Sequence, residues 1–176
     1  MRPGAYSRRG EVKEIESVIR NRFNNIEAIE APSTLEGGDI MMVGNHYYIG
    51  LSNRTNLEGA KQIIKILNKY GMSGSTISLN KMLHLKTGLS FLENNNLIVC
   101  DEFKNDSRFD QYNSIEIPEI EGYAANCIWV NGFVIIPLGY PITQEKIRNA
   151  GYTVLETDVS EFQKLDGGIS CLSLRY

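Results

Sequence analysis

The chain has 176 residues, of which 42% are hydrophobic and 22% are charged, and its formal net charge is -3. This length and composition predict one globular domain and exclude an intrinsically disordered chain. The acidic balance argues against a nucleic-acid partner, because such binding depends on clustered Lys and Arg. No apolar run reaches the roughly 20 residues that span a bilayer, so we expect a cytoplasmic protein that does not bind membranes.

The N-terminal third begins with a short loop and a predicted helix. Residues 2–5, Arg-Pro-Gly-Ala, are typical of a loop that follows a strand, and we therefore expect further sequence before Met1. The apolar pattern predicts a helix at 11–23 and a strand at 26–30. The expected domain is a single one at 1–176 that lacks its N-terminal part.

A hairpin, a helix and a strand follow in that order. Two apolar runs flank Gly44-Asn45-His46 and predict a β-hairpin over residues 39–51. Apolar residues at helical spacing predict an amphipathic helix at 56–69 that stops at Gly71, and a strand is expected at 75–79.

The same order returns towards the C-terminus. Strands at 126–130 and 133–137, a helix at 143–150 and a strand at 152–156 repeat the earlier pattern. A weaker copy has apolar runs at 85–92 and 97–100 around the turn 93–96, with a possible strand at 112–117. Because such a unit cannot bury its own apolar face, the repeats predict an α/β fold in which sister units pack around a common axis.

Three stretches at the borders of these units are rich in glycine, acids and reactive side chains: residues 34–39, 83–88 and 165–171. If the borders converge near the axis, Glu36, His84 and Cys171 could share one cleft as orienting acid, base and nucleophile. Taken singly, each residue has a simpler explanation. Cys171 could be a small buried apolar residue, His84 a hydrogen-bonded core histidine, and Glu36 a carboxylate that binds turn amides.

The chain has three cysteines, which are widely spaced and form no CxxC pair. This pattern favours free thiols in a reducing compartment and indicates no metal site. Cys100 and Cys127 have apolar neighbours and are expected to be buried in strands.

Six short motifs, taken together and in order, carry a family resemblance. They are Arg-Pro-Gly-x-x-Ser-Arg-Arg at 2–9, Thr-Leu-Glu-Gly-Gly-Asp at 34–39, Ser-x-Arg-Thr-Asn at 52–56, Leu-His-Leu-Lys at 83–86, Ala-Asn-Cys-Ile at 125–128 and Asp-Gly-Gly-x-Ser-Cys-x-Ser-Leu at 166–174. With them the chain closely resembles the dimethylarginine dimethylaminohydrolases of the pentein superfamily. The resemblance implies a pentein-type α/β propeller of five ββαβ units, here incomplete, with about three and a half units present.

The resemblance also implies a reaction. It makes Cys171 the nucleophile that attacks the carbon of a substituted guanidinium, His84 the general acid and base, and Glu36 the carboxylate that orients His84. Dimethylarginine or monomethylarginine would give citrulline and dimethylamine or methylamine, through a covalent thiouronium intermediate. No metal or organic cofactor is implied.

Further residues match the family's substrate-binding positions. Arg8 and Arg54 would hold the carboxylate of the amino-acid substrate, because guanidinium groups bind carboxylates through paired hydrogen bonds. Leu165 and Asp166 would lie near the polar end of the substrate. Lys86 stands where arginine and agmatine deiminases carry an acid, which favours the dimethylaminohydrolase branch.

Alternatives stay open at this point. The family's guanidinium-binding acids come from an N-terminal segment that precedes these motifs, so we expect little activity from this chain alone and either a homodimer or a companion chain that supplies the missing units. The fold could instead be a non-catalytic remnant or a binding fragment. An arginine deiminase or amidinotransferase activity would use the same Cys, His and acid.

Overall fold

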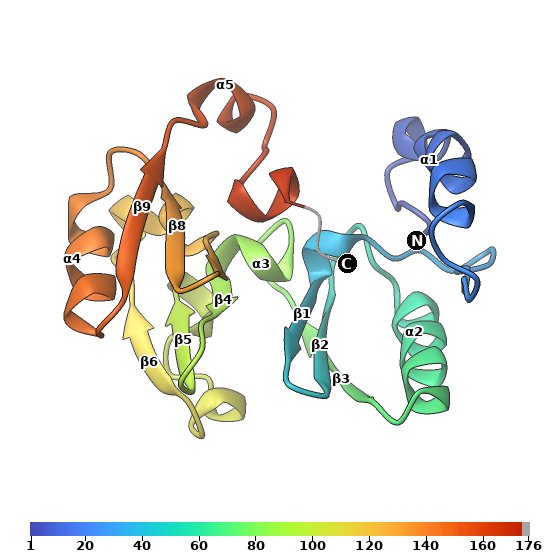
Figure 1. The fold of residues 1–176 in the computed structure, drawn as a ribbon. Coiled ribbons are helices and arrows are strands. Elements are labelled where there is room, and N and C mark those ends of the chain that lie inside the picture. Colours follow the sequence, from blue (N-terminus) through green and yellow to red (C-terminus); the bar gives the residue numbers. More distant parts are fainter. Residues whose placement is uncertain (174–176) are drawn as a thin grey trace. The chain divides into compact units, whose positions relative to one another are not determined.

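The computed structural model describes residues 1–173, which fall into two compact units, Met1–Leu85 and a second unit that begins at Lys86. Figure 1 shows the course of the chain within each unit. Leu174, the last residue of the sixth motif, lies outside the described residues. The interpretation of residues 1–176 as a single domain stays a prediction.

The first unit contains the predicted hairpin, helix and strand. Its elements are β1 (Ile40–Val43), β2 (His46–Leu51), α2 (Leu57–Lys69) and β3 (Ser73–Ser78). The strands form one sheet in the order β1-β2-β3, in which β2 pairs antiparallel with β1 and parallel with β3. The hairpin turns at Gly44, whose φ of 56° lies in the left-handed region that glycine adopts without steric cost. Helix α2 lies beside this sheet (Figure 1).

Local chemistry fixes where α2 begins. The Asn56 side chain accepts a hydrogen bond from the Gly59 N–H at 2.8 Å, which satisfies one of the free donors at the helix start. The same oxygen accepts from the Thr34 N–H at 3.0 Å. Asn56 therefore ties the start of α2 to the segment that leads into Glu36.

The N-terminal helix is α1 (Glu11–Arg20), three residues shorter than predicted at its C-terminal end. The strand predicted at 26–30 was wrong, because this segment pairs with no other strand in the described residues. Its backbone is bound instead by a side chain of α2: Gln62 accepts from the Glu30 N–H at 3.0 Å and donates to the Glu30 carbonyl at 3.3 Å. Ile29 is buried in the apolar core of this unit, which explains the strand-like pattern.

The second unit contains two more sheets of the same topology. Helix α3 (Leu85–Gly88) begins at the last residue of the first unit and leads into the second. The strands of the two sheets are β4 (Leu89–Phe91), β5 (Asn96–Val99), β6 (Asn113–Glu116), β7 (Ile128–Val130), β8 (Phe133–Pro137) and β9 (Thr153–Thr157), and α4 (Pro141–Asn149) stands between β8 and β9 in the chain. In each sheet the middle strand pairs antiparallel with the strand before it and parallel with the strand after it. Between β5 and β6, short 3-10 turns stand where the other sheets have a helix, which is why the sequence pattern of this copy was weak.

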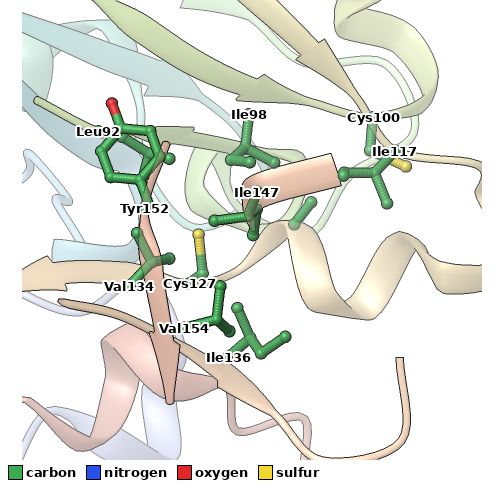
Figure 2. Close-up of a cluster of buried hydrophobic side chains, with 11 residues drawn as sticks. Leu92, Ile98, Cys100, Ile117, Cys127, Val134, Ile136, Ile147, Tyr152 and Val154 are labelled. Carbon is green, nitrogen blue, oxygen red and sulfur yellow. The ribbon is translucent and has the colours of Figure 1, made fainter. Parts of the chain in front are cut away.

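The apolar core of the second unit lies between these elements. Figure 2 shows it as a cluster of aliphatic, sulfur-containing and aromatic side chains from the strands, from α4 and from the segments beside them. The cluster comprises Leu92, Ile98, Cys100, Ile117, Ala125, Cys127, Val134, Ile136, Ile147, Tyr152 and Val154. The sulfur of Cys127 lies among these apolar side chains (Figure 2). Cys100 and Cys127 are buried as expected, but the prediction that they lie in strands was wrong, because Cys100 directly follows β5 and Cys127 directly precedes β7.

A buried acid caps α4. Glu121, in the 3-10 helix η5 (Glu119–Ala125), accepts from the Ile142 N–H at 3.1 Å, from the Thr143 N–H at 2.7 Å and from the Thr143 hydroxyl at 2.8 Å. A carboxylate at a helix N-terminus binds free amides and complements the helix dipole. Segment 119–126 is thereby fixed against α4.

The fold is thus a mixed α/β fold with three sheets of one topology within the described residues. Among residues 1–173, no helix is long and apolar enough to cross a membrane.

Candidate active site

Glu36 lies at the start of the 3-10 helix η2 (Gly37–Asp39), directly before β1, and only 4% of it is exposed. One carboxylate oxygen accepts from the Gly4 N–H at 3.0 Å and from the Ala5 N–H at 3.2 Å. The other oxygen lies 2.9 Å from Nε2 of His84. The loop of the first motif and the histidine of the fourth motif therefore converge on this one carboxylate.

The bond between His84 and Glu36 fixes the histidine tautomer. An ionised carboxylate can only accept, so Nε2 of His84 carries the hydrogen and Nδ1 remains for other chemistry. The ring lies on Gly38, where an added Cβ would come within 2.7 Å of Cγ of His84. Glycine at this position is thus required by the close approach of the imidazole.

The charge state of Glu36 follows from its surroundings. Burial acts to raise its pKa, but the Ala5 N–H, His84 and the positive charge of Arg54 together hold the pKa of this carboxyl below its ordinary value of 4.5. Glu36 is therefore ionised at neutral pH and can stabilise a positively charged His84.

Arg8 and Arg54, the two predicted substrate-binding arginines, both lie beside Glu36. An Nη1 atom of Arg8 is 3.5 Å from one carboxylate oxygen, and Nη1 of Arg54 is 3.9 Å from the other. Arg8 also forms an ion pair with Glu11 at 3.0 Å. Half of the Arg8 side chain and a third of the Arg54 side chain are exposed, so both guanidinium groups can reach a small molecule.

Asp39 is a site residue whose role the sequence did not reveal. It is fully buried and accepts from the Ser52 hydroxyl at 2.8 Å, the Thr55 hydroxyl at 2.6 Å and the Leu85 N–H at 3.0 Å. Burial raises the pKa of Asp39, and its hydrogen bonds only partly offset that effect.

The partners of Asp39 belong to the segments that carry the candidate residues. Thr55 follows Arg54, and its hydroxyl also accepts from the Glu36 N–H at 3.0 Å. Leu85 follows His84 in the chain. Asp39 therefore fixes the backbone beside Glu36, Arg54 and His84. Asp39 is the last residue of the second motif, which marks it in the sequence, but the spacing of residues along the chain does not indicate its hydrogen-bond partners.

Cys171 belongs to the second unit, in the 3-10 helix η6 (Ile169–Leu172). Its N–H donates to the Gly168 carbonyl at 2.9 Å, which closes a tight turn. Gly168 and Ile169 are buried whereas Cys171 is exposed, so the turn presents the cysteine to solvent. This exposure contradicts the simpler explanation of Cys171 as a buried apolar residue.

The other two cysteines lie in the core. Burial raises the pKa of the Cys127 thiol to about 12 and also raises the pKa of Cys100. Since the thiolate is the nucleophilic form, neither residue is suited to attack a substrate. Within residues 1–173, no group of three His, Cys, Asp or Glu side chains could hold a metal ion.

The segment before Cys171 carries the two remaining predicted residues. Leu165 and Asp166 follow the short helix α5 (Ser160–Gln163), and both are exposed. Asp166 adopts a positive φ of 59°, and the Tyr123 hydroxyl donates to the Gly167 carbonyl at 2.5 Å.

The first unit thus brings together Glu36, His84, Arg8 and Arg54, while Cys171, Leu165 and Asp166 lie in the second. The expectation that all of them line one cleft stays a prediction.

Comparison with known proteins places the chain in a class of enzymes that modify guanidino groups. A family model described as arginine deiminase matches residues 5–126. The chain belongs to the family that contains the arginine deiminases and the dimethylarginine dimethylaminohydrolases.

Particular relatives narrow this class. The N(G),N(G)-dimethylarginine dimethylaminohydrolase of Pseudomonas aeruginosa is 59% identical over 176 residues, covering 99% of this chain and 69% of the relative. The enzyme of the same name from Streptomyces coelicolor is 30% identical to this chain, and the match covers 99% of this chain and 67% of the relative. The chain thus spans about two thirds of the length of these relatives.

Solved structures agree with the sequence comparison. A mutant of the Pseudomonas aeruginosa enzyme complexed with citrulline matches with a TM-score of 0.97 and 58% identity, over 99% of this chain and 69% of the other. The product-bound N-terminal domain of ArgZ, a cyanobacterial arginine dihydrolase, matches with a TM-score of 0.88 and 25% identity, over 99% of this chain and 68% of the other.

Proposed function

We propose that this chain is a hydrolase that cleaves a C–N bond of a substituted guanidinium, with dimethylarginine or monomethylarginine as substrate and citrulline as product. The observation that carries the proposal is the buried, ionised Glu36 bound to Nε2 of His84 at 2.9 Å, in a chain of this family. A paired acid and imidazole are what the release of an amine requires. The name of the Pseudomonas aeruginosa relative and its citrulline complex support the substrate class.

In the proposed reaction, the Cys171 thiolate forms a bond to the central guanidinium carbon. His84, as imidazolium, gives its proton to the methylated nitrogen, the C–N bond breaks, and dimethylamine or methylamine leaves. The substrate carbon is then held as a thiouronium on sulfur.

Hydrolysis regenerates the enzyme. Neutral His84 takes one proton from a water molecule as its oxygen bonds to the thiouronium carbon. Breakage of the C–S bond returns the thiolate, the second proton of the water passes to solvent, where the released amine takes up a proton, and citrulline is formed. Glu36 stabilises His84 whenever the imidazole is charged. The reaction changes no oxidation state, and the proposal requires no cofactor.

Substrate recognition is proposed to use both charged ends of the amino acid. Arg8 and Arg54 suit the α-carboxylate through charge-assisted hydrogen bonds, with Glu36 close enough to keep both guanidinium groups oriented. Leu165 and Asp166 are proposed to lie at the polar end of the substrate, because their loop leads directly to Cys171.

We propose a pentein-type propeller for the arrangement of the units. Three sheets of identical strand order support this proposal. A homodimer or a companion chain that adds further units, and a cytoplasmic location, are part of the same proposal. Sedimentation as a monomer at high concentration would argue against the homodimer.

Chloroacetamidine, an amidine with a reactive carbon, tests the proposed function. Mass spectrometry should find it on Cys171, and His84→Ala should reduce the labelling. Label spread evenly over Cys100 and Cys127 would overturn the assignment. Product analysis with dimethylarginine separates hydrolysis from its alternatives, because a deiminase acts on unmethylated arginine and an amidinotransferase yields ornithine in place of citrulline.

A further inference from the structure

The motif Ala-Asn-Cys-Ile at 125–128 has no role in the reaction described above, yet its asparagine contacts the segment that carries Cys171. Oδ1 of Asn126 accepts from the Ser170 N–H at 2.8 Å, and Nδ2 of Asn126 donates to the Ser170 hydroxyl at 3.0 Å. Ser170 directly precedes Cys171. Asn126 therefore holds the peptide that leads into the cysteine by two hydrogen bonds.

A third contact fixes the orientation of the Asn126 amide. Nδ2 also donates to the Lys86 carbonyl at 2.8 Å. Because a carbonyl can only accept and the Ser170 N–H can only donate, the oxygen and nitrogen of this side chain cannot exchange places. Asn126 is only 8% exposed, so water cannot readily replace these partners.

Gly168 packs directly on this amide. A Cβ at position 168 would lie 2.7 Å from both Cγ and Oδ1 of Asn126. The backbone at Gly168 is extended, with φ of -124°, so the close approach and not an unusual dihedral angle demands glycine here. The Gly168 carbonyl in turn accepts from the Cys171 N–H at 2.9 Å.

A second side chain of the same segment holds the other end of the turn. The Tyr123 hydroxyl donates to the Gly167 carbonyl at 2.5 Å. Tyr123 and Asn126 stand three residues apart, and Glu121 anchors their segment to α4. The turn at 167–171 is thus held at two points by a segment that is itself fixed.

We propose that Asn126 is a positioning residue for the nucleophile, which sets the direction in which Cys171 presents its sulfur. The inference rests on the proposed function, in which the sulfur must approach the face of a planar guanidinium carbon. Such an attack depends on alignment, since misplacement by about 1 Å can cost roughly a hundredfold in rate. Alkylation by iodoacetamide, a neutral reagent without an amidinium group, has a weaker geometric requirement than alkylation by a cationic amidine that must align with the site.

The test compares two reagents on four variants, of which Asn126→Asp is the fourth. Asn126→Ala removes all three hydrogen bonds, and Ser170→Ala removes only the contact to the hydroxyl. Asn96→Ala is the matched control, because Asn96 is a partly buried asparagine of the same unit that donates to the Tyr152 hydroxyl at 2.7 Å, away from the cysteine turn. For the wild type and each variant, the rates of Cys171 modification by chloroacetamidine and by iodoacetamide are measured. Urea unfolding measures the stability of each variant.

We expect Asn126→Ala to lower the ratio of the amidine rate to the iodoacetamide rate by roughly tenfold or more. Ser170→Ala should lower it by less, and Asn96→Ala should leave it at the wild-type value. Asn126→Asp should lower it by less than Asn126→Ala, because a carboxylate still accepts from the Ser170 N–H but cannot donate to the Lys86 carbonyl. A ratio unchanged in Asn126→Ala, with stability reduced as in Asn96→Ala, would show a merely structural role and overturn the inference.

Amide hydrogen exchange keeps the two proposals separable. If wild-type Cys171 shows no preference for the amidine, the proposed function fails, and exchange at Ser170 and Cys171 then decides the inference on its own. Faster exchange of both amides in Asn126→Ala but not in Asn96→Ala supports positioning by Asn126. Unchanged exchange refutes it.

Discussion

The hydroxyl of Thr55 provides the sharpest test of the network in the first unit. Thr55→Val keeps the shape of the side chain but removes the donor to Asp39 at 2.6 Å and the acceptor of the Glu36 N–H at 3.0 Å. A hydrogen bond to a charged group contributes about 1.5–3 kcal/mol and a neutral one about 0.5–1.5 kcal/mol. Both are lost at a site that is 1% exposed, where water cannot compensate.

We therefore expect Thr55→Val to lower the free energy of unfolding by about 2–4 kcal/mol. Urea unfolding followed by circular dichroism measures this change, and Thr55→Ser, which keeps the hydroxyl, should recover most of it. Turnover by Thr55→Val should also fall at temperatures where the variant is folded, because the backbone beside Arg54 is no longer fixed. A loss of stability below about 0.5 kcal/mol would refute the view that this hydroxyl joins the two acids.

Three further predictions follow from the geometry of single residues. The pKa of Glu36 is lowered in the folded state, so its contribution to the free energy of unfolding is complete above its ordinary pKa of 4.5 and is lost as the pH falls through the lower pKa of the folded state. Urea unfolding at a series of pH values should show this acid-side loss for the wild type and not for Glu36→Gln. The same dependence of stability on pH in both proteins would contradict the prediction. Cys171→Ser should abolish amidine labelling and change the free energy of unfolding by less than about 0.5 kcal/mol. Cys127→Ser, in the core, should lower the free energy of unfolding by about 1–3 kcal/mol and leave the labelling at Cys171. The reverse pattern would make Cys127 the reactive cysteine and Cys171 the structural one. Gly38→Ala places a Cβ 2.7 Å from Cγ of His84 and should reduce turnover by roughly tenfold or more, measured as citrulline release, and full activity would show that the imidazole does not depend on this contact.

Much of the fold could be predicted because its units are local. The hairpin, α2 and β3 follow one another within some forty residues, and their apolar periodicity and turn glycine identified each element. The strand predicted at 26–30 failed for a tertiary reason, since Gln62 of α2 occupies the backbone groups that a neighbouring strand would need.

The candidate site was predictable in part. Glu36 and His84 stand 48 residues apart, and no periodicity joins them. The family resemblance suggested the pair, and in the structure Nε2 of His84 lies 2.9 Å from a carboxylate oxygen of Glu36. Asp39 and Asn126 were visible in motifs, but their roles depend on partners distant in the chain, such as Leu85 and Ser170. Hydrogen-bond networks of this kind are a property of the folded chain.

The capping of α4 by Glu121 has a consequence for engineering. The same short segment that completes a helix start also carries Tyr123 and Asn126, so its tolerance to substitution is limited by two separate demands. A library that varies residues 119–126 for thermostability would select for helix capping without regard to the cysteine turn, and stable but catalytically poor variants should accumulate. A better strategy would leave this segment constant and place stabilising changes on the exposed face of α4.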